Sequence, residues 1–379
     1  MAIDFSCVPN PCYVIEEARL RQNLETISYV AKSAGVEIIL ALKGFALWKT
    51  FPIVRQYVRT ATASSLNEAR LCVETFGEKA HIYCVAIDDR DIDALLDCAS
   101  HITFNSFSQF ERFKHKARAK GVSIGLRVNP EHREVQTDLY NPCSPYSRLG
   151  LTAEHFQNGL PSEIEGLHLH GLCENDSFAS ERMLNAFEEK FGKLFSQLRW
   201  VNLGGGHLIT RKGYDTAHFI SVLKAFKARY PHLQVILEPG GAFAWQTGYL
   251  VSKVLDIVEN RGVKTAIVNV SFTDHMPDCL EMPYKPSILG AIPEYRKGLC
   301  NYRIGGLSCL AGDFMTEYAF EKPLQVGDLI VFEDMIHYTI VKTTMFNGIS
   351  HPALGMWTAD NQFTLFRSFD YEDYKNRMS

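Results

Sequence analysis

Short apolar runs recur along the first two thirds of the chain, and each run turns polar or rich in glycine at its end. Longer stretches with helical periodicity separate them, and this rhythm predicts alternating strands and helices. Eight such units are typical of a closed barrel whose active site lies at the carboxyl ends of the strands. The eight runs are EIILALKG (37–44), TATASS (60–65), HIYCVA (81–86), HITFNS (101–106), SIGLRVNP (123–130), EIEGLHLHG (163–171), RWVNLGGG (199–206) and QVILEPGG (234–241).

The helical stretches carry their own start and stop signals. In SSLNEARLCVETFG, Ser65 can cap the first turn, Glu68 follows three residues later, and Gly77 ends the segment. A second stretch, SFSQFERFKHKARAKG, is expected to end at Gly121. These signals place helices directly after two of the predicted strands.

The rhythm changes after Gly241, where runs of strand character follow one another without long helices between them. We therefore predict an α/β protein of two domains, a (β/α)8 TIM-like barrel over residues 20–245 and a C-terminal β domain over 246–379 that includes the N-terminal segment 1–19. The runs behind the second domain are TGYLVSKVLDIVEN (247–260), VKTAIVNVS (263–271), LCNYRIGGLSC (299–309) and GDLIVFEDMIHYTIV (327–341).

Composition narrows the class of protein. The 379 residues are 46% hydrophobic, which suffices for a large core, and a net charge of -4 without long charged runs disfavours nucleic acid as a partner. The N-terminus lacks a basic start followed by an apolar stretch, and no window approaches the length of a membrane span. We expect a soluble cytoplasmic protein whose ten cysteines, with no CxxC pair, are mostly reduced.

Candidate chemistry gathers at the ends of the predicted strands. Lys43 closes the first run, where an apolar approach can lower the pKa of its amine and allow it to attack an aldehyde. The segment NLGGGH (202–207) offers Gly204, Gly205 and Gly206, whose amides can approach an anion, although a plain tight turn fits it as well. Glu238 follows the eighth run and precedes a further glycine pair, Gly240 and Gly241; a glutamate that caps a local loop is the alternative.

His168 and His170 alternate with leucines in LHLH, and we expect only one of them to point into the barrel. A metal site could recruit His170, Cys173 and Glu174, but their spacing fits no standard zinc pattern. We therefore predict no metal. An amine, an imidazole, glycine loops and a glutamate at the ends of different strands together suit a flat, phosphorylated aldehyde.

These landmarks and their order make the chain similar to the alanine racemase-like (fold type III) decarboxylases. This family depends on pyridoxal 5'-phosphate (PLP) and includes diaminopimelate, ornithine and carboxynorspermidine decarboxylases. The resemblance covers nearly the whole chain. It implies that ALKG holds the cofactor lysine, HLHG the ring-stacking His170, NLGGG the phosphate loop and EPG the partner of the pyridine nitrogen, followed by CLAGD (309–313).

The same resemblance gives the second domain its part in the site. Cys309 would reach the active site of the neighbouring subunit, and Tyr338 matches a tyrosine that touches the cofactor phosphate. Both imply an obligate homodimer with shared active sites. Asp313 strengthens the match around Cys309, whose alternative is an inert buried thiol.

The resemblance also implies a mechanism. Lys43 would bind the cofactor covalently until the substrate amine displaces it, and Glu238 would keep the pyridine nitrogen protonated, which favours loss of carbon dioxide. Family racemases carry an arginine at the Glu238 position. Cys309 would return a proton to the substrate carbon, with Lys43 as the competing donor.

Departures from the family pattern indicate the substrate. Diaminopimelate decarboxylases read EPGR, whose arginine binds a carboxylate, but Gly241 stands here. Leu310 replaces the acidic residue that grips a distal amine in the relatives. Both changes weaken the case for diaminopimelate and ornithine.

An acidic cluster appears instead in SFTDHMPDCLEMPY (271–284), where Asp274 matches the substrate-contacting aspartate of the family and Asp278 and Glu281 lie nearby; a solvated loop is the alternative for the last two. Glu174 and Asp313 complete the expected substrate contacts. HLHGLCE, this segment and ALGMW resemble the carboxynorspermidine branch, which implies decarboxylation of carboxynorspermidine, and of carboxyspermidine, to norspermidine or spermidine. The alternatives are a diaminopimelate or other basic amino-acid decarboxylase, a racemase, and a non-catalytic PLP-binding protein.

Overall fold

The computed structural model describes residues 3–282 and 284–379, so positions 1, 2 and 283 of the predicted segments lie outside the described residues. The chain divides into two compact units. The barrel unit is Asn23–Phe243, and the sheet unit combines Met1–Gln22 with Ala244–Ser379.

The barrel unit contains a closed parallel sheet, which confirms the predicted eight-stranded barrel. The first predicted strand is split at Ile39, whose N–H donates to the Leu237 carbonyl of the last strand, 2.9 Å away. Its two pieces pair with the last and the second strand, and this closes the ring. The strands are β2 (Glu37–Ile38), β3 (Leu40–Ala41), β4 (Ala61–Ala63), β5 (Ala80–Tyr83), β6 (Ala99–Phe104), β7 (Ser123–Val128), β8 (Gly166–Leu169), β9 (Trp200–Asn202) and β10 (Gln234–Leu237).

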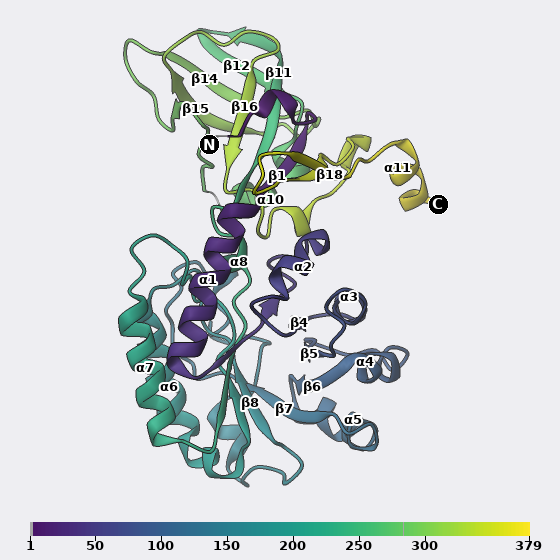
Figure 1. Ribbon diagram of the computed structural model, residues 1–379, viewed down its shortest axis with the longest axis vertical. Helices are drawn as coiled ribbons and strands as arrows, with labels where there is room; N and C mark the ends of the chain where they lie inside the picture. The colour runs from purple at the N-terminus through teal and green to yellow at the C-terminus, as the bar shows by residue number, and fades with distance from the viewer. Residues whose placement is uncertain (1–2, 283) are drawn as a thin grey trace. The chain divides into compact units, whose positions relative to one another are not determined.

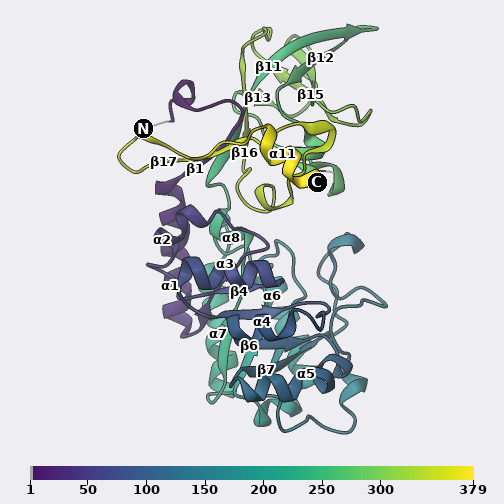
Figure 2. The same ribbon diagram turned by 90° about the vertical axis from the view of Figure 1, so that its right-hand side faces the viewer.

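Helices lie outside the barrel strands, as Figures 1 and 2 show for α3 to α7. The helices are α1 (Glu17–Ala34), α2 (Phe51–Val54), α3 (Leu66–Phe76), α4 (Ile92–Cys98), α5 (Phe107–Ala119), α6 (Ser177–Phe191), α7 (Thr216–Arg229) and α8 (Gly241–Ala244). The predicted start of α3 is confirmed, because Ser65 Oγ accepts the Glu68 N–H at 3.2 Å and Gly77 ends the helix with φ 73°. On α5, Phe110 and Phe113 are buried, and each contributes roughly 1.5 to 3 kcal/mol of burial free energy.

One indole lies at the amino-terminal end of the barrel strands, where Trp200 begins β9. Trp200 on β9 is buried, and its Nε1–H donates to Ser123 Oγ at 2.9 Å. A Cβ on Gly125 would lie 2.3 Å from this ring, and one on Gly166 would lie 2.0 Å from it. The next two strands of the barrel, β8 and β7, therefore carry glycine where the ring lies against them.

The sheet unit is built around a nine-stranded mixed sheet, in the order β13-β15-β14-β12-β11-β1-β17-β18, with β16 also paired to β11. Its strands are β1 (Cys12–Glu16), β11 (Gly248–Asn260), β12 (Val263–Val268), β13 (Ala291–Ile292), β14 (Cys300–Gly305), β15 (Phe314–Phe320), β16 (Leu329–Glu333), β17 (Ala353–Trp357) and β18 (Phe363–Arg367). Its helices are α9 (Phe272–His275), α10 (Pro277–Glu281) and α11 (Tyr371–Met378).

One predicted strand is too long. The run 327–341 forms strand only in β16, and its second half turns away at Asp334, whose φ is 60°, and ends in the 3₁₀ helix η6 (Ile340–Lys342). An apolar run alone does not reveal such a break, because strand and tight turn share its composition. Within the described residues, no helix combines the length and the apolar character needed to cross a bilayer.

Candidate active site

Lys43 lies in the turn directly after β3, at the carboxyl end of the first barrel strand. The next residue, Gly44, is in close backbone contact with Gly240 after β10, because a Cβ on Gly44 would lie 2.8 Å from the Gly240 Cα. Neither position has room for a side chain. This contact brings the turn that carries Lys43 beside the loop that carries Glu238.

The amine of Lys43 lies beside an imidazole. Lys43 Nζ is 3.4 Å from His170 Nε2, and His170 Nδ1 accepts the Gly205 N–H at 2.9 Å. Lys43 keeps contact with solvent, yet the protein packed around its amine lowers the pKa of Lys43, and the nearby Arg127 cation lowers it further. A lysine in this state is more nucleophilic at neutral pH than an ordinary surface lysine.

Both histidines of LHLH face the barrel interior, so the prediction that only one would do so is wrong. His168 is buried, its Nε2 lies 3.6 Å from Glu238 Oε2, and its ring centroid is 6.4 Å from that of His170. Side chains two residues apart on a strand share one face, which is the rule that the prediction misapplied. His168 is therefore part of the site.

Glu238 follows β10 and is buried beside an amide. Glu238 Oε1 accepts from Asn202 Nδ2 at 2.6 Å, and Asn202 Oδ1 accepts the Gly204 N–H at 2.9 Å. The Glu238 N–H in turn donates to the Gly204 carbonyl at 2.7 Å. Burial raises the pKa of Glu238. Asn202, which the sequence reasoning missed, thus links the glutamate to the glycine loop.

The glycine loop is held tightly by its neighbours. An added Cβ would lie 2.3 Å from the Leu169 carbonyl at Gly204, 2.5 Å from the Glu238 carbonyl at Gly205 and 2.2 Å from Leu172 at Gly206. The amides of Gly204 and Gly205 already donate to Asn202 and His170. Two of the loop's amides therefore serve protein acceptors, and binding of an anion by this loop stays a prediction.

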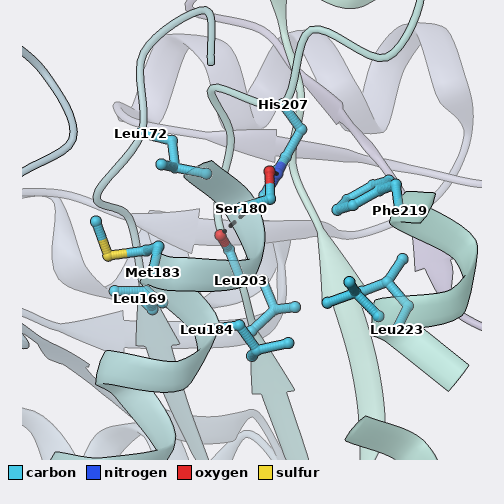
Figure 3. A pocket seen from close by; sticks show the side chains of 10 residues that line it. Leu169, Leu172, Ser180, Met183, Leu184, Leu203, His207, Phe219 and Leu223 are labelled. Carbon is cyan, nitrogen blue, oxygen red and sulfur yellow. Dashed lines mark hydrogen bonds between the residues drawn. The ribbon is translucent and has the colours of Figure 1, made fainter. Parts of the chain in front are cut away.

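A small apolar pocket lies behind this loop, between β8, β9, α6 and α7 (Figure 3). His207, which follows the three glycines, lines it; Nδ1 is 3.0 Å from Ser180 Oγ on α6, and Nε2 is 3.3 Å from the Leu203 carbonyl. Burial lowers the pKa of His207 to about 4, so the ring is neutral at physiological pH. His207 therefore anchors the glycine loop to α6 rather than carrying charge.

Arg127 is a second residue that the sequence reasoning missed. It is buried on β7, its Nη2 donates to the His170 carbonyl at 3.2 Å, and its guanidinium lies 4.6 Å from the centroid of the Tyr83 ring. A charged residue inside the apolar run SIGLRVNP was the available signal, because buried arginine is rare without a function or a partner.

In the sheet unit, Cys309 lies on an exposed loop after β14, and its N–H donates to Asn347 Oδ1 at 2.7 Å. The nearby Asp313 is buried, and its carboxylate accepts the N–H groups of Phe272, Thr273 and Ser308 at 2.7 to 3.2 Å. Asp313 was predicted to contact substrate. Three backbone donors already use both of its oxygens, so Asp313 joins the start of α9 to the loop that carries Ser308 and Cys309.

The predicted acidic cluster divides into two kinds of residue. Asp274 is fully buried, and its Oδ1 accepts the Phe346 N–H at 2.7 Å, while its Oδ2 has no hydrogen-bond partner among residues 3–282 and 284–379. Asp278 and Glu281 both bind the ammonium of Lys342. Lys342 therefore neutralises part of a cluster that the sequence suggested was purely acidic.

The remaining predicted residues lie on turns. Glu174 is exposed, with φ 54°, and its carbonyl accepts from Arg211 at 3.3 Å. Tyr338 also has a left-handed backbone, with φ 42°, and its carbonyl accepts the N–H of Val341 and of Lys342, each at 3.1 Å. Gly241 begins α8 directly after Gly240.

A closed β/α barrel with a lysine at the end of its first strand, together with a mixed sheet unit, is the fold of the type III pyridoxal enzymes. Comparison with known proteins narrows this class. Residues 12–336 match the family model described as "Pyridoxal-dependent decarboxylase, C-terminal sheet domain". The chain belongs to this family of decarboxylases and is a carboxy-lyase.

Curated relatives span the full chain. A carboxyaminopropylagmatine decarboxylase of Synechocystis is 51% identical over 98% of this chain and 96% of the relative. A carboxynorspermidine/carboxyspermidine decarboxylase of Campylobacter jejuni is 44% identical over 98% of both chains. The crystal structure of carboxynorspermidine decarboxylase from C. jejuni, complexed with norspermidine, has a TM-score of 0.90 at 43% identity and covers 98% of this chain and 100% of that one. Three diaminopimelate decarboxylases match at only 22 to 25% identity.

Proposed function

We propose that this protein binds PLP through Lys43 and decarboxylates a carboxylated polyamine. The observation that carries the proposal is the convergence of the Lys43 amine, the His170 ring and the Glu238 carboxylate on one end of the barrel. Lys43 Nζ and His170 Nε2 are 3.4 Å apart, and His168 brings its ring within 3.6 Å of Glu238. The amine can bond to the aldehyde of PLP, the flat imidazole can cover its pyridine ring, and the carboxylate can pair with the ring nitrogen.

The residues present fit this cofactor. Gly206, Gly240 and Gly241 carry no side chains that would obstruct a phosphate. Tyr338 is assigned to the phosphate by resemblance alone. Bound there, PLP would supply a sink for the electron pair left on the substrate α-carbon when carbon dioxide departs.

The chain's own groups perform the remaining tasks. Glu238 would hold a proton at the pyridine nitrogen of PLP, and the raised pKa of this carboxyl group favours sharing that proton over releasing it. The Gly205 N–H holds His170 in place, and this imidazole would cover one face of the pyridine ring of PLP. Cys309 returns a proton to the α-carbon, and its exposed thiol on a well-anchored loop suits this role.

Reduction of the cofactor-loaded protein with borohydride tests the cofactor assignment. We expect a pyridoxyl label on the peptide that contains Lys43 and no label in Lys43→Ala. A label on another lysine, or none on the wild-type protein, would remove the basis of the proposal.

The substrate proposal rests on charge. Gly241 provides no cation for a second carboxylate, while Asp274 has a buried carboxylate oxygen without a partner in the described part of the chain. A substrate with one carboxylate and several ammonium groups fits this pattern. Carboxynorspermidine and carboxyspermidine are such compounds, and the corresponding products are norspermidine and spermidine.

Carboxyaminopropylagmatine is a second candidate, favoured by the 51% identity to the Synechocystis enzyme. It shares the carboxylated polyamine end and differs in a terminal guanidinium. Incubation with these three compounds, diaminopimelate, ornithine and arginine, followed by mass analysis of the products, separates the candidates. We expect kcat/KM for at least one carboxylated polyamine to exceed that for diaminopimelate by about 100-fold or more. Turnover of diaminopimelate alone would contradict the proposal.

We further propose a homodimer in which Cys309 serves the site of the partner. Light scattering should give twice the chain mass of 42.9 kDa. Mixing Lys43→Ala with Cys309→Ala subunits should restore activity above that of either variant, because a hybrid dimer would hold one intact site. Mixtures no more active than their components would contradict shared sites.

A further inference from the structure

Four hydrogen bonds join Cys309 and Asp274 into a closed ring. On one side, the Cys309 N–H donates to Asn347 Oδ1 and the Phe346 N–H donates to Asp274 Oδ1, each at 2.7 Å. On the other side, Asp313 accepts from the residues next to them, the N–H of Thr273 at 3.2 Å and that of Ser308 at 2.9 Å. The two proposed site residues of the sheet unit are therefore linked by two independent routes.

The first route depends on a short segment after the 3₁₀ helix η6. Thr344 Oγ1 donates to Asp274 Oδ1 at 2.5 Å, and the Thr344 N–H donates to the Asp274 carbonyl at 2.9 Å. Phe346 and Asn347 follow at once in the chain. The segment lies beyond residue 336, where the match to the family model ends.

Asn347 holds an unusual backbone conformation. Its φ is 58°, in the left-handed region that asparagine tolerates better than most residues. This conformation lets the side chain reach a partner 38 residues earlier in the chain. Gly348 follows with φ 72°, and an added Cβ there would lie 3.4 Å from the Tyr374 ring on α11. The C-terminal helix therefore packs against the turn that carries Asn347.

We propose that Asn347 is a positioning residue, which places Cys309 relative to Asp274 so that the proton returns to the carbon that lost carbon dioxide. This inference rests on the proposed function. Loss of carbon dioxide leaves an electron pair, and the amine product forms only when a proton adds to that same carbon. If Cys309 is displaced, carbon dioxide still leaves, but part of the electron pair takes up its proton at the aldehyde-derived carbon of the cofactor instead. Water then releases the decarboxylated substrate as an aldehyde, its amino group stays on the cofactor, and less than one amine forms for each carbon dioxide.

Three variants separate the hydrogen bond from the backbone conformation. Asn347→Gly keeps the left-handed turn and removes the acceptor, whereas Asn347→Asp keeps both. Asn361→Gly is a matched control, because Asn361 also has a left-handed φ of 62° but lies on the turn between β17 and β18. Melting temperatures verify that each variant is folded.

The two readouts are the ratio of amine to carbon dioxide and the hydrogen exchange of the 306–313 backbone. In Asn347→Gly we expect the ratio of amine to carbon dioxide to fall about threefold, which is on the order of the effect of losing one hydrogen bond. Hydrogen exchange at the Cys309 N–H should accelerate about tenfold. Asn347→Asp and Asn361→Gly should match the wild type in both. An unchanged ratio in folded Asn347→Gly, or an equal loss in folded Asn347→Asp, would overturn the proposal. Failure of the wild type to form amine would instead refute the proposed function, and the exchange data would still test the hydrogen bond.

Discussion

His170 donates toward the amine of Lys43 and does not accept from it. The Gly205 N–H donates to His170 Nδ1 at 2.9 Å, so the neutral ring must carry its hydrogen on Nε2, which lies 3.4 Å from Lys43 Nζ. Burial lowers the pKa of His170 well below its usual value, which keeps the ring neutral. The contact is favourable only when the lysine is neutral as well.

Arg127 helps to keep Lys43 neutral, and its removal should be visible in a pH profile. The protein packed around the Lys43 amine is the largest cause of its lowered pKa and the Arg127 cation is the second, so Arg127→Gln should raise that pKa. Attachment of PLP to apoprotein, followed by absorbance, should then need a higher pH. Arg59→Gln, at a side chain that is 77% exposed, is the control and should leave the profile unchanged. An unshifted midpoint in Arg127→Gln would mean that desolvation by the surrounding protein alone lowers the pKa of Lys43.

Asn202 should control the affinity for the cofactor through Glu238. Asn202→Asp keeps an acceptor for the Gly204 N–H but replaces the donor that lies 2.6 Å from Glu238 Oε1 by a second carboxylate oxygen. Two carboxylates at this distance cannot both ionise, so Glu238 becomes a poorer partner for the pyridine nitrogen. We expect the dissociation constant for PLP, measured by absorbance titration, to rise about tenfold. Asn158→Asp, on an exposed turn, should bind PLP normally.

A side chain at Gly206 should destabilise the protein by steric collision as well as by backbone strain. Gly206→Ala places a Cβ 2.2 Å from the backbone of Leu172 at φ 87°, whereas Gly213→Ala has φ 82° and nothing within 4 Å. Gly213→Ala should therefore cost about 1 to 2 kcal/mol of unfolding free energy, the strain of the conformation alone. Gly206→Ala should cost more and also weaken PLP binding. Urea unfolding and absorbance titration would measure both, and equal losses in the two variants would contradict the steric argument.

The buried histidines of the barrel should make the protein sensitive to acid. Burial lowers the pKa of His81 and His168 well below 6.5, and that of His207 to about 4. Below pH 6.5 the unfolded chain binds protons that the folded chain excludes, so stability is complete above that pH and falls as the pH drops toward 4. Each histidine adds up to about 1.4 kcal/mol per pH unit to the slope.

Urea unfolding at several pH values measures this slope. His207→Gln should make it shallower, and His115→Gln, at an exposed position on α5, should not change it. Glu238 acts in the opposite direction. Because its pKa is raised in the folded protein, its protonation increases the free energy of unfolding as the pH falls. A flat dependence between pH 6.5 and 5 would therefore show that the histidine contributions are offset or absent.

The barrel could be predicted from sequence because each strand is a local apolar run with a polar end. Lys43, Glu238 and the glycines could be proposed as site residues for the same reason, since each closes such a run. Strands β1, β17 and β18 carry no local signal of their partners, and β1 pairs with segments more than 200 residues away. A strand at the start of a chain is hard to assign when its pairing is that distant.

Other residues of the candidate site could not be predicted from the sequence for a similar reason. Lys342 reaches Asp278 across 64 positions in the chain, and no spacing rule anticipates that contact. Asp313 was assigned by motif, but its three backbone donors come from helix α9 and from the loop after β14, which only the tertiary fold brings together. The error at His168 was different, since correct use of strand alternation would have placed both histidines inside.

The indole of Trp200 restricts which substitutions are possible at positions 125, 166 and 200. Trp200 fills the volume that side chains at positions 125 and 166 would need, so a smaller residue at 200 leaves a void and a larger one at either glycine collides. Substitutions at the three sites will therefore be non-additive, and lost volume at one must be regained at another. Barrels of this kind with a smaller ring at position 200 are expected to carry alanine or a larger residue in place of at least one of these glycines.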